Sequence, residues 1–478
     1  MRSTRGLDES FFNGPQAIKP KRRIQTTGEG MDRRWYYLGL ALLVAGVIFL
    51  QALLIVGGLL LLLVLSITDI WARYCLQELS YQRTLSERQV TFGEEITLAL
   101  AMENAKLLPL PWIELDDRMP PGLTVKGETL SSAGMRRDMK TLECLFSARW
   151  YERVTRRYSI SCTTRGVHTF GPAVLRSGDI FGFINREVHF PDYQYLLVYP
   201  LVVPITSFGL PARHPFGDRR APRRLLEDPS RVIGVRDYVY GDSLRRVNWK
   251  ATARTMQLQS KVYEATTTYT LTLFLNVYST FDAHYGIHPE LQELAICAAA
   301  SVSQWAIDQG FAVGLYANTI MSIPDEEETR QDGGGVEHQG VSAESQMNRR
   351  RVHLPAASSA EQLTRIMDVL ARIQTYFGTH IEDVLLTERS RLPAGATVVV
   401  ITSSVSERLV DTLSRMRQGG HSVAILFVGD NPPPVSLAGI TVYHLGGEKT
   451  WEALVANYSR PSSESLERTV ESVSSFSL

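Results

Sequence analysis

The sequence has few cysteines and no net charge. Only four of the 478 residues are cysteine and none are spaced as C-x-x-C, which excludes a zinc ribbon and a disulfide framework and suits a reducing compartment. Lysine plus arginine and aspartate plus glutamate both total 50, so overall charge favours neither nucleic acid nor an acidic ligand. The ten histidines show no ligand-like pairing, and G-x-S-x-G and H-E-x-x-H are absent. These absences predict a protein that is not an enzyme.

Two glycine-containing segments have the wrong spacing for nucleotide loops. Gly446–Thr450 reads GGEKT, but it lacks the Gly-Lys-Thr order and the distant first glycine of a phosphate loop. Gly333–Gly335 is not followed by a third spaced glycine, so it is no dinucleotide fingerprint. We therefore predict no cofactor.

One long apolar run extends from Trp35 to Trp71. As a single helix it would be roughly 55 Å long, against a hydrocarbon core of about 30 Å, so two membrane passes folded near Gln51 fit better. Gly57-Gly58 is an alternative turn, but it would leave a second helix too short to span. A single tilted helix that exports the rest of the chain is the other alternative.

The charges around residues 35–71 predict the topology. Residues 1–34 are polar and basic, which indicates a disordered leader on the cytoplasmic side. A hairpin would return the chain to that side, with aromatic residues at both ends of the run in one interface. We expect a multi-pass protein of the cell membrane with two helices and cytoplasmic soluble domains.

Residues 79–205 have short alternating runs of apolar and polar residues between proline and glycine turns. Glu95–Met102 and Tyr158–Cys162 are such runs, and Pro120–Gly122 is such a turn. The pattern predicts a β-sandwich.

Residues 206–268 begin with a basic linker that contains six arginines up to residue 235. A single aromatic residue, Phe216, lies among them, which is too few for a nucleic-acid stacking platform, so we expect a solvated or phospholipid-facing surface and no nucleic acid. The following stretch is the richest in charged, aromatic and turn residues. In it, Gly241 and Asp242 predict a turn, with Asp242 capping a helix that begins at Ser243.

The apolar residues after this turn recur at helical spacing. Leu244, Val247 and Ala251 predict one buried helix face, on which Asn248 would need hydrogen-bond partners. Residues 257–262 then alternate as a half-buried strand.

Two further side chains on this helix have predicted contacts. Arg245 lies one turn before Trp249, which predicts guanidinium–indole stacking. The stretch is either a clamp between the flanking domains or a binding surface. Its position between them favours the clamp, and Trp249 would then be buried.

The stretch resembles the bacterial family catalogued as domain of unknown function 58. The family text REY-x-x-GDS-x-R-x-INWKATAR is matched from Arg236 to Arg254, with Asp237 where Glu is usual and Val247 where Ile is usual. Arg165-Gly166, Phe170–Pro172 and Gly178–Gly182 also resemble family blocks, which we interpret as strand corners. The signature positions expected to be structural or partner-binding are Arg236, Tyr238, Gly241, Asp242, Arg245, Asn248, Trp249, Lys250 and Arg254.

Residues 269–458 alternate between strand and helix patterns. We expect strands at 269–277, 312–317, 397–402, 422–428 and 441–444, with helices at 289–309, 360–376 and 405–417. This order predicts a parallel, doubly wound α/β sheet, and the family resemblance implies a von Willebrand factor type A-like domain. Residues 322–354 would form a mobile insert and residues 459–478 a disordered tail.

A type A domain can bind Mg²⁺ through Asp-x-Ser-x-Ser after its first strand. The matching positions here are Asn276, Tyr278 and Thr280, and Ser403-Ser404 stands where a second Asp is often found. Asn lacks the charge, and Tyr cannot place its hydroxyl as Ser does. We predict a degraded site without metal, although Asp282 leaves open a rebuilt one.

These features predict a membrane-anchored binding or scaffold protein. The family resemblance implies a MoxR-type AAA+ ATPase as partner, in protein assembly or maturation. The alternatives are a metal-dependent ligand-binding receptor of the type A class and, third, a hydrolase, for which the sequence offers no nucleophile.

Overall fold

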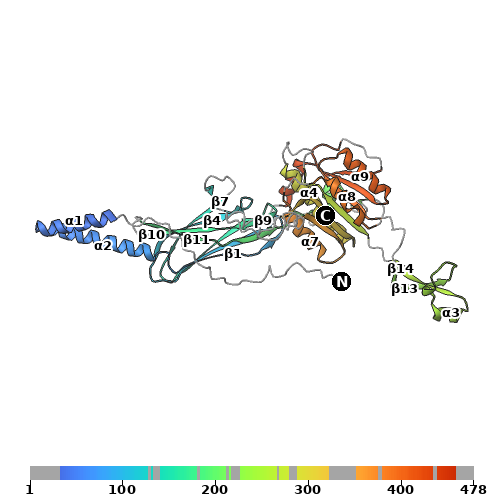
Figure 1. The fold of residues 1–478 in the computed structure, drawn as a ribbon, viewed down its shortest axis with the longest axis horizontal. Helices are drawn as coiled ribbons and strands as arrows, with labels where there is room; N and C mark the ends of the chain where they lie inside the picture. The colour runs from blue at the N-terminus through green and yellow to red at the C-terminus, as the bar shows by residue number, and fades with distance from the viewer. Residues whose placement is uncertain are drawn as a thin grey trace, which may run out of the picture. The chain divides into compact units, whose positions relative to one another are not determined.

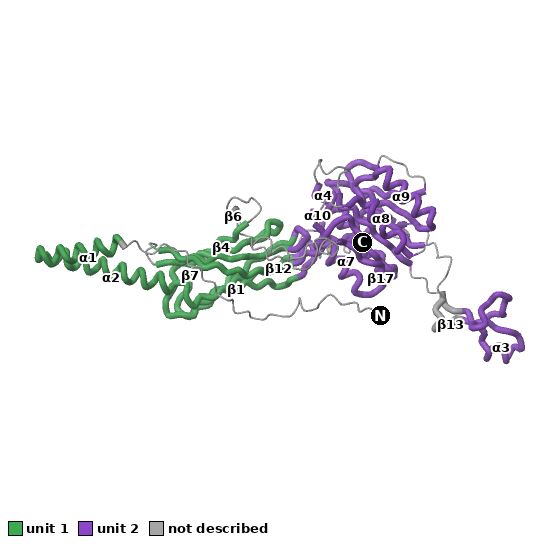
Figure 2. Tube along the Cα trace, in the orientation of Figure 1, with its two compact units in different colours: residues 1–88, 95–162, 168–196 green, residues 89–94, 163–167, 197–478 purple. Residues whose placement is uncertain are grey.

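The chain divides into two compact units (Figure 2). Unit 1 comprises residues 1–88, 95–162 and 168–196, and unit 2 comprises residues 89–94, 163–167 and 197–478. The structure is a computed structural model, and it describes residues 33–126, 131–132, 140–179, 184–211, 215–216, 227–265, 269–278, 288–321, 351–374, 379–393, 395–433 and 439–458. The tail, most of the insert and residues 1–32 of the leader expected from the sequence lie outside these residues, whereas Arg33 and Arg34, expected in the leader, belong to a helix.

The apolar run forms two helices, α1 (Arg33–Ile48) and α2 (Ala52–Tyr74) (Figure 1). The chain breaks at residues 49–51, so the turn predicted near Gln51 is confirmed and the alternative at Gly57-Gly58, inside α2, is wrong. Among the described residues, α2 alone is long and apolar enough to cross a membrane by length and composition, and α1 is a shorter apolar helix. Two membrane passes stay a prediction.

Glycines allow the two helices to approach closely. A Cβ at Gly58 would lie 2.8 Å from the backbone nitrogen of Leu43, and one at Gly46 would lie 2.7 Å from that of Ile55. Small residues at such crossings let helix backbones pack against one another. The hydroxyl of Tyr36 adds a hydrogen bond to the carbonyl of Leu65 at 3.1 Å.

Unit 1 also contains two antiparallel sheets, so the β-rich region expected after the apolar run is present. Burial alternates along strands such as β1 because successive side chains point to opposite faces of a sheet. The first sheet has the order β1 (Leu79–Leu85), β3 (Glu95–Asn104), β8 (Arg153–Ser161), β5 (Thr124–Val125), and the second has the order β11 (Asn185–Phe190), β10 (Ala173–Gly178), β4 (Leu110–Met119), β7 (Lys140–Ala148), β6 (Ser131–Ser132).

A buried ion pair joins these two sheets. Asp117 on β4 accepts hydrogen bonds from the hydroxyl of Tyr81 at 2.9 Å and from Nε of Arg83 at 2.8 Å, both on β1. The side chains of Arg83 and Asp117 are 2% and 0% exposed. Arg83 Nη1 also donates to the carbonyls of Phe170 and Asp192, each at 3.2 Å. Each charge therefore has a partner, as burial in a low-dielectric interior requires.

Unit 2 contains a six-stranded sheet in which every neighbouring pair is parallel except β16 and β17. The parallel α/β sheet expected from the sequence is therefore confirmed for five of its six strands, and the antiparallel edge strand β17 was not expected. Its order is β17 (Arg351–Ala357), β16 (Ala312–Ile320), β15 (Thr270–Leu275), β18 (Thr397–Thr402), β19 (Ser422–Phe427), β20 (Thr441–His444).

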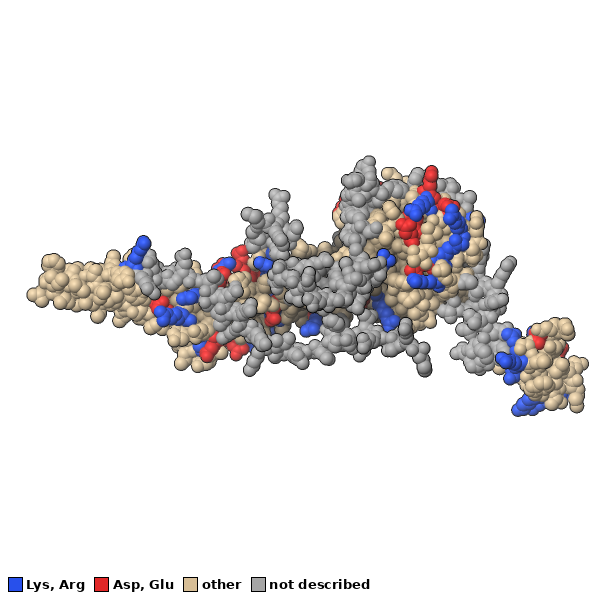
Figure 3. Space-filling view, in the orientation of Figure 1, with Lys and Arg blue, Asp and Glu red and all other residues tan. Residues whose placement is uncertain are grey.

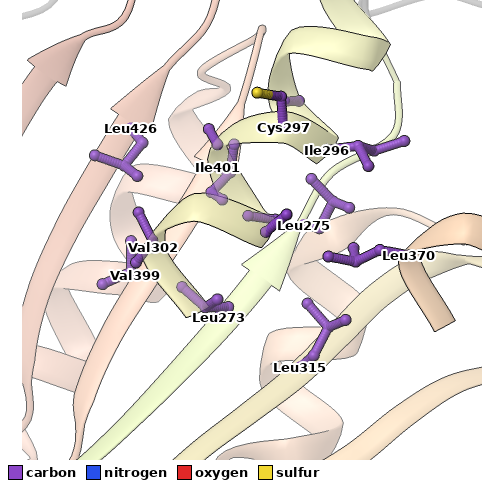
Figure 4. Packing of buried hydrophobic residues seen from close by; sticks show 14 of the residues in the cluster. Leu273, Leu275, Ile296, Cys297, Val302, Leu315, Leu370, Val399, Ile401 and Leu426 are labelled. Atoms are coloured by element: carbon purple, nitrogen blue, oxygen red, sulfur yellow. The ribbon is translucent and has the colours of Figure 1, made fainter. Parts of the chain in front are cut away.

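Helices cover both faces of this sheet. Leu273 and Leu275 of β15 pack into one core with α4 (Pro289–Asp308), α7 (Gln362–Arg372) and α10 (Glu448–Tyr458) (Figure 4). Phe274, between them, packs into a second core with α8 (Ile381–Glu388) and α9 (Glu407–Gln418). The apolar side chains at alternate positions of one buried strand thus fill two cores, which is the doubly wound arrangement.

Several elements of unit 2 depart from the expected boundaries. β17 begins at Arg351, so residues 351–354 belong to a strand and not to an insert. The expected basic linker ran to residue 235, but β13 (Glu227–Asp237) occupies its end. β2 (Gln89–Val90) pairs in parallel with Leu197 and Val198 of β12 (Gln194–Val198). This pairing connects residues 89–94 to unit 2, which also includes residues 163–167.

Candidate functional site

The family signature forms a small module, residues 227–265, which we call the signature module. β13 pairs antiparallel with β14 (Gln259–Ala265), and between them lie a single 3-10 turn, η3 (Leu244–Arg246), and the helix α3 (Trp249–Thr255) (Figure 1). The strand expected at 257–262 is thus present as β14, with a later boundary. The module is too small to enclose a core, so polar contacts determine its turns.

Asp242 organises the first turn of the module. Its carboxylate accepts from Nη2 of Arg236 at 2.8 Å and from the backbone nitrogen of Val239 at 3.2 Å. The hydrogen bond from the Val239 N–H has the largest effect, and with the Arg236 guanidinium it holds the pKa of Asp242 below its ordinary value. The hydroxyl of Tyr238 donates to the carbonyl of Asp242 at 2.9 Å, and Gly241 has a φ of 109°, which only glycine adopts without strain.

Asn248 organises the second turn. Its side-chain oxygen accepts from the backbone nitrogen of Ala251 at 3.3 Å, so Asn248 is the N-cap of α3. Its own backbone nitrogen donates to the carbonyl of Gln259 at 2.8 Å. The backbone nitrogen of Gln259 in turn donates to the hydroxyl of Thr252 at 3.0 Å, which ties the helix to β14. The partners that Asn248 needs are therefore backbone groups.

The helix predicted from Ser243 is wrong. Val247 is extended, with φ −64° and ψ 127°, and it separates η3 from α3. Its side chain is buried and it forms a bridge to Ser260. The predicted capping role of Asp242 is also wrong, because its carboxylate is engaged in the preceding turn.

The remaining signature side chains point into solvent. Trp249 is 68% exposed, so the prediction that its indole is buried is wrong. The cation–π contacts found in the described part of the chain involve Arg83 and Arg156, so the predicted stacking of Arg245 on Trp249 is also absent there. The signature thus divides into internal turn residues and an exposed group of Arg245, Trp249, Lys250 and Arg254.

The second candidate site is the carboxyl edge of the parallel sheet, where Asn276 follows β15. Asn276 is 6% exposed, and its Nδ2 donates to the hydroxyl of Thr402 at 2.9 Å. Its Oδ1 accepts from Nδ2 of Asn318 at 2.8 Å and from the backbone nitrogen of Tyr278 at 3.1 Å. Both ends of the carboxamide are therefore used within the protein.

The groups around Asn276 do not fit a divalent cation. The hydroxyl of Thr402 donates to the carbonyl of Ser404 at 2.7 Å, and the hydroxyl of Ser403 donates to the carbonyl of Tyr278 at 2.7 Å. The oxygens that would face a cation thus already take part in a neutral hydrogen-bond network, and a hard cation prefers charged oxygen ligands. Thr280 and Asp282 lie outside the described residues. Within those residues, no group of three or more His, Cys, Asp or Glu side chains is placed to hold a metal.

A hollow of about 200 Å³ lies beside this network, and its lining includes Tyr278, His380, Glu382 and Arg408. Its charges are engaged within the domain. The hydroxyl of Ser406 donates to Glu382, and Arg408 forms an ion pair with Asp383 at 2.9 Å. This edge therefore offers a ligand no unpaired carboxylate or guanidinium from Glu382 and Arg408.

The Arg165-Gly166 block has a structural role. Nη1 of Arg165 donates to the carbonyls of Leu370 and Ile373 at 3.0 and 3.2 Å, at the carboxyl end of α7, and its Nε pairs with Glu293 at 2.9 Å. A cation at the end of a helix satisfies free carbonyls and the helix dipole together.

The other two family blocks also stabilise backbone turns. Gly171 has a φ of 98°, and a Cβ there would lie 2.3 Å from the carbonyl oxygen of Asp192. Asp179 accepts from the backbone nitrogen of Ile184 at 2.7 Å. The described parts of these blocks serve strand corners, as predicted.

The GGEKT segment is closed by the protein itself. α10 begins at Glu448, whose backbone nitrogen donates to Oδ1 of Asp430 at 3.1 Å. A Cβ at Gly447 would lie 2.1 Å from the same oxygen. A carboxylate of the chain therefore already lies where a phosphate loop would place its anion.

Sequence reasoning missed four residues of these networks. Asp237 accepts from Nε2 of Gln259 at 2.6 Å, and Thr252 accepts from the backbone of the same residue. Asn318 lies on β16 and Thr402 at the end of β18, far from Asn276 in sequence. The available signal was polar residues at the carboxyl ends of adjacent parallel strands, which meet at one edge of a sheet.

Comparison with known proteins bears on the signature module. Residues 234–332 match the model of a family described as protein of unknown function DUF58. The uncharacterized protein YeaD of Bacillus subtilis strain 168 is 25% identical over 246 residues, which are 51% of this chain and 57% of that protein. The match thus spans little more than half of the relative's length.

Two solved structures share less. The CARDB domain of a Pyrococcus furiosus protein is 10% identical over 25% of this chain and 91% of that chain, with a TM-score of 0.16. The sporulation control protein Spo0M of Bacillus subtilis is 14% identical over 26% of this chain and 50% of that chain, with a TM-score of 0.16. At such scores neither structure bears on the fold. The family-model match and the YeaD relative together support placing this chain in the DUF58 family.

Proposed function

We propose that this chain is a membrane-anchored binding protein that recruits a protein partner and catalyses no reaction itself. The observation that carries the proposal is the exposure of Trp249, at 68%, in the middle of the family signature. An internal clamp would bury this indole, whereas Trp and Arg are the residues most enriched in energetically dominant interface positions. The exposed half of the signature therefore has the composition of a recognition surface.

The proposed partner is a MoxR-type AAA+ ATPase, acting with this chain in protein assembly or maturation. The ATPase class comes from the resemblance to the DUF58 family. The closed networks at the sheet edge and at α10 support a non-catalytic role, since their polar groups bond to one another. The α/β half is proposed to be von Willebrand factor type A-like, because its mostly parallel sheet carries polar groups at the carboxyl edge. The neutral network around Asn276 does not favour the metal-dependent receptor.

Co-purification tests the partnership. The full chain in detergent, carrying an affinity tag, is mixed with the MoxR-type ATPase from the same organism, with and without ATP. We expect saturable capture of the ATPase. An unrelated AAA+ ATPase of the same oligomeric form is the control, and equal capture of both, or capture of neither, would contradict the proposal.

The membrane arrangement is proposed as two passes, α1 and α2, with both soluble units in the cytoplasm. It is supported by the length and composition of α2 and by the packing of α1 against it at Gly46 and Gly58. A cysteine placed at Ser463 should resist a membrane-impermeant maleimide in intact cells and react after lysis. Labelling of intact cells would mean a single pass and an exported body.

A further inference from the structure

We propose that the exposed face of the signature module binds an acidic protein segment that carries apolar side chains among its carboxylates. This inference rests on the proposed function, because it specifies the chemistry of the partner at the same surface. It is carried by the apolar composition of the face, by its excess of cations and by the position of those cations beside the apolar side chains.

Large apolar side chains are unusually exposed on this module. The exposed fraction is 68% for Trp249 and 88% for Met256, and Tyr240 is fully exposed. Apolar patches of this kind on soluble surfaces mark interaction sites. The exposed apolar residues between 239 and 258 are Val239, Tyr240, Leu244, Trp249, Met256 and Leu258.

The helix α3 places apolar and basic side chains next to one another. Trp249 and Ala253 lie four residues apart on one exposed face, and Lys250 and Arg254 lie four residues apart beside it. Thr252 is on the inner side, where its hydroxyl accepts from the backbone of β14. In Figure 3, uncharged atoms cover most of the visible face of the module, and Lys and Arg atoms lie at its margins.

The charge of the module is unbalanced. Residues 227–265 contain seven Lys and Arg and five Asp and Glu, a net charge of +2, and between residues 232 and 262 six cations face two carboxylates, Asp237 and Asp242. Both carboxylates are already engaged, Asp242 by Arg236 and Asp237 by the amide of Gln259. No ion pair to Arg245, Lys250 or Arg254 occurs within the described residues. A partner that supplies carboxylates would complement these three cations.

The mixture favours an acidic peptide over nucleic acid or a membrane surface. Four of the six exposed apolar residues are aliphatic, and aliphatic side chains provide no stacking platform for bases. Membrane-lying elements separate a basic face from an apolar face. On α3, Lys250 and Arg254 lie beside the stripe of Trp249 and Ala253 and not on the opposite side of the helix. A ligand that carries carboxylates next to apolar groups matches this arrangement.

Fluorescence anisotropy with the full chain in detergent tests the inference. The probe is a short labelled peptide in which Leu and Phe alternate with Glu. Two matched peptides replace Glu by Lys, or Leu and Phe by Ser. We expect binding of the first peptide alone, weakened by raised salt. Trp249→Ala should weaken binding about tenfold or more, as for a buried hot-spot residue, and Lys250→Glu with Arg254→Glu should abolish it.

Matched substitutions elsewhere are the controls. Trp150→Ala removes an indole that is 63% exposed in unit 1, and Arg157→Glu reverses an exposed charge on β8. Both variants should bind the peptide as the wild type does. Circular dichroism checks that the signature variants stay folded, which is expected because the altered side chains are exposed.

Several outcomes would overturn the inference. They are failure of the acidic peptide to bind, equal loss in the control variants, or tighter binding of single-stranded DNA or of phosphatidylglycerol vesicles at the same surface. These outcomes are distinguishable from failure of the proposed function. Capture of the ATPase unaffected by Trp249→Ala refutes the surface and keeps the partnership. Peptide binding that depends on Trp249, without capture of any ATPase, keeps the surface and refutes the partnership.

Discussion

Asn276→Asp should destabilise the α/β sheet even though it introduces the aspartate that the proposed type A likeness would place at this position. The substitution keeps the two bonds that the side-chain oxygen accepts from Asn318 and from the backbone of Tyr278. It removes the bond that Nδ2 donates to the hydroxyl of Thr402. In its place a carboxylate oxygen would face a hydroxyl whose hydrogen is already donated to the carbonyl of Ser404.

The magnitude follows from these contacts. One lost hydrogen bond costs about 1 kcal/mol, and an acceptor left facing another acceptor in a buried site costs about 1–3 kcal/mol more. Asn276 is 6% exposed, so water cannot repair the contact or solvate the new charge fully. We therefore expect a loss of about 3 kcal/mol in the free energy of unfolding of the sheet, which is about a hundredfold in the opening equilibrium.

Hydrogen–deuterium exchange of the full chain, read by mass spectrometry, measures this loss locally. Peptides that cover β15 and β18 should exchange about a hundredfold faster in the variant, if exchange follows the opening equilibrium. Asn457→Asp is the control, because it makes the same chemical change at an exposed position of α10. It should alter exchange of these peptides little. Each sample is measured with and without millimolar MgCl₂.

Two results would refute the reasoning. Unchanged protection of β15 and β18 in Asn276→Asp would mean that the carboxamide network does not stabilise this edge. Restoration of protection by Mg²⁺ would mean that only the charge is missing, and that the groups around Asn276 do accept a cation.

Three further predictions concern the other networks. Asp117→Asn should destabilise unit 1 by about 3–5 kcal/mol in chemical denaturation, because the buried Arg83 loses its counterion; a loss below 1 kcal/mol would contradict this. Trp249→Ala should change the free energy of unfolding by less than about 0.5 kcal/mol, since the indole is exposed. A loss of several kcal/mol would instead support the interpretation of the stretch as a clamp between domains. The pKa of Asp242 is lowered, so its carboxylate stabilises the turn fully above pH 3.8, and this stabilisation is lost as the pH falls through the folded pKa. Hydrogen exchange of the Val239 amide, corrected for the intrinsic rate, should accelerate over that range. Asp242→Asn should remove this pH dependence.

The regular strands were predictable because their sequence patterns are compatible with one kind of secondary structure. β18 and β20 have the expected boundaries, 397–402 and 441–444, and β15 lies within its expected range. A short run of β-branched and apolar residues between turns fits a buried parallel strand. α8 escaped prediction because eight residues contain too few turns for a clear period.

The signature module was mispredicted because its residues fit two structures equally well. Val247 has the spacing of a helix face, but it also fits an extended bridge to Ser260, which the structure has. Asp242 after Gly241 suits a helix cap and a turn. Arg236, six residues earlier, stabilises the turn because it forms an ion pair with the Asp242 carboxylate. Propensity could not reveal this choice, because it depends on a partner in the preceding strand.

The sheet-edge network was beyond prediction for a different reason. Asn276 follows β15, whereas Asn318 and Thr402 lie on β16 and β18, and the separations of 42 and 126 residues carry no periodic signal. The sequence showed that Asn276 lacks a charge. It did not show which neighbouring groups bond to the Asn276 carboxamide, including the acceptor of the hydrogen bond that a carboxylate could not donate.

Residues 89–94 and 163–167 have a consequence for how this protein is made and dissected. They belong to unit 2, although most of the chain around them belongs to unit 1, so the polypeptide passes between the units five times. Phe92 packs edge-to-face on Trp451 at 6.0 Å, and Arg165 closes the end of α7. A fragment cut at a single linear boundary near residue 205 would therefore lack part of its own interior. During synthesis these two segments leave the ribosome hundreds of residues before Trp451, so the α/β half can complete its folding only after release of nearly the whole chain.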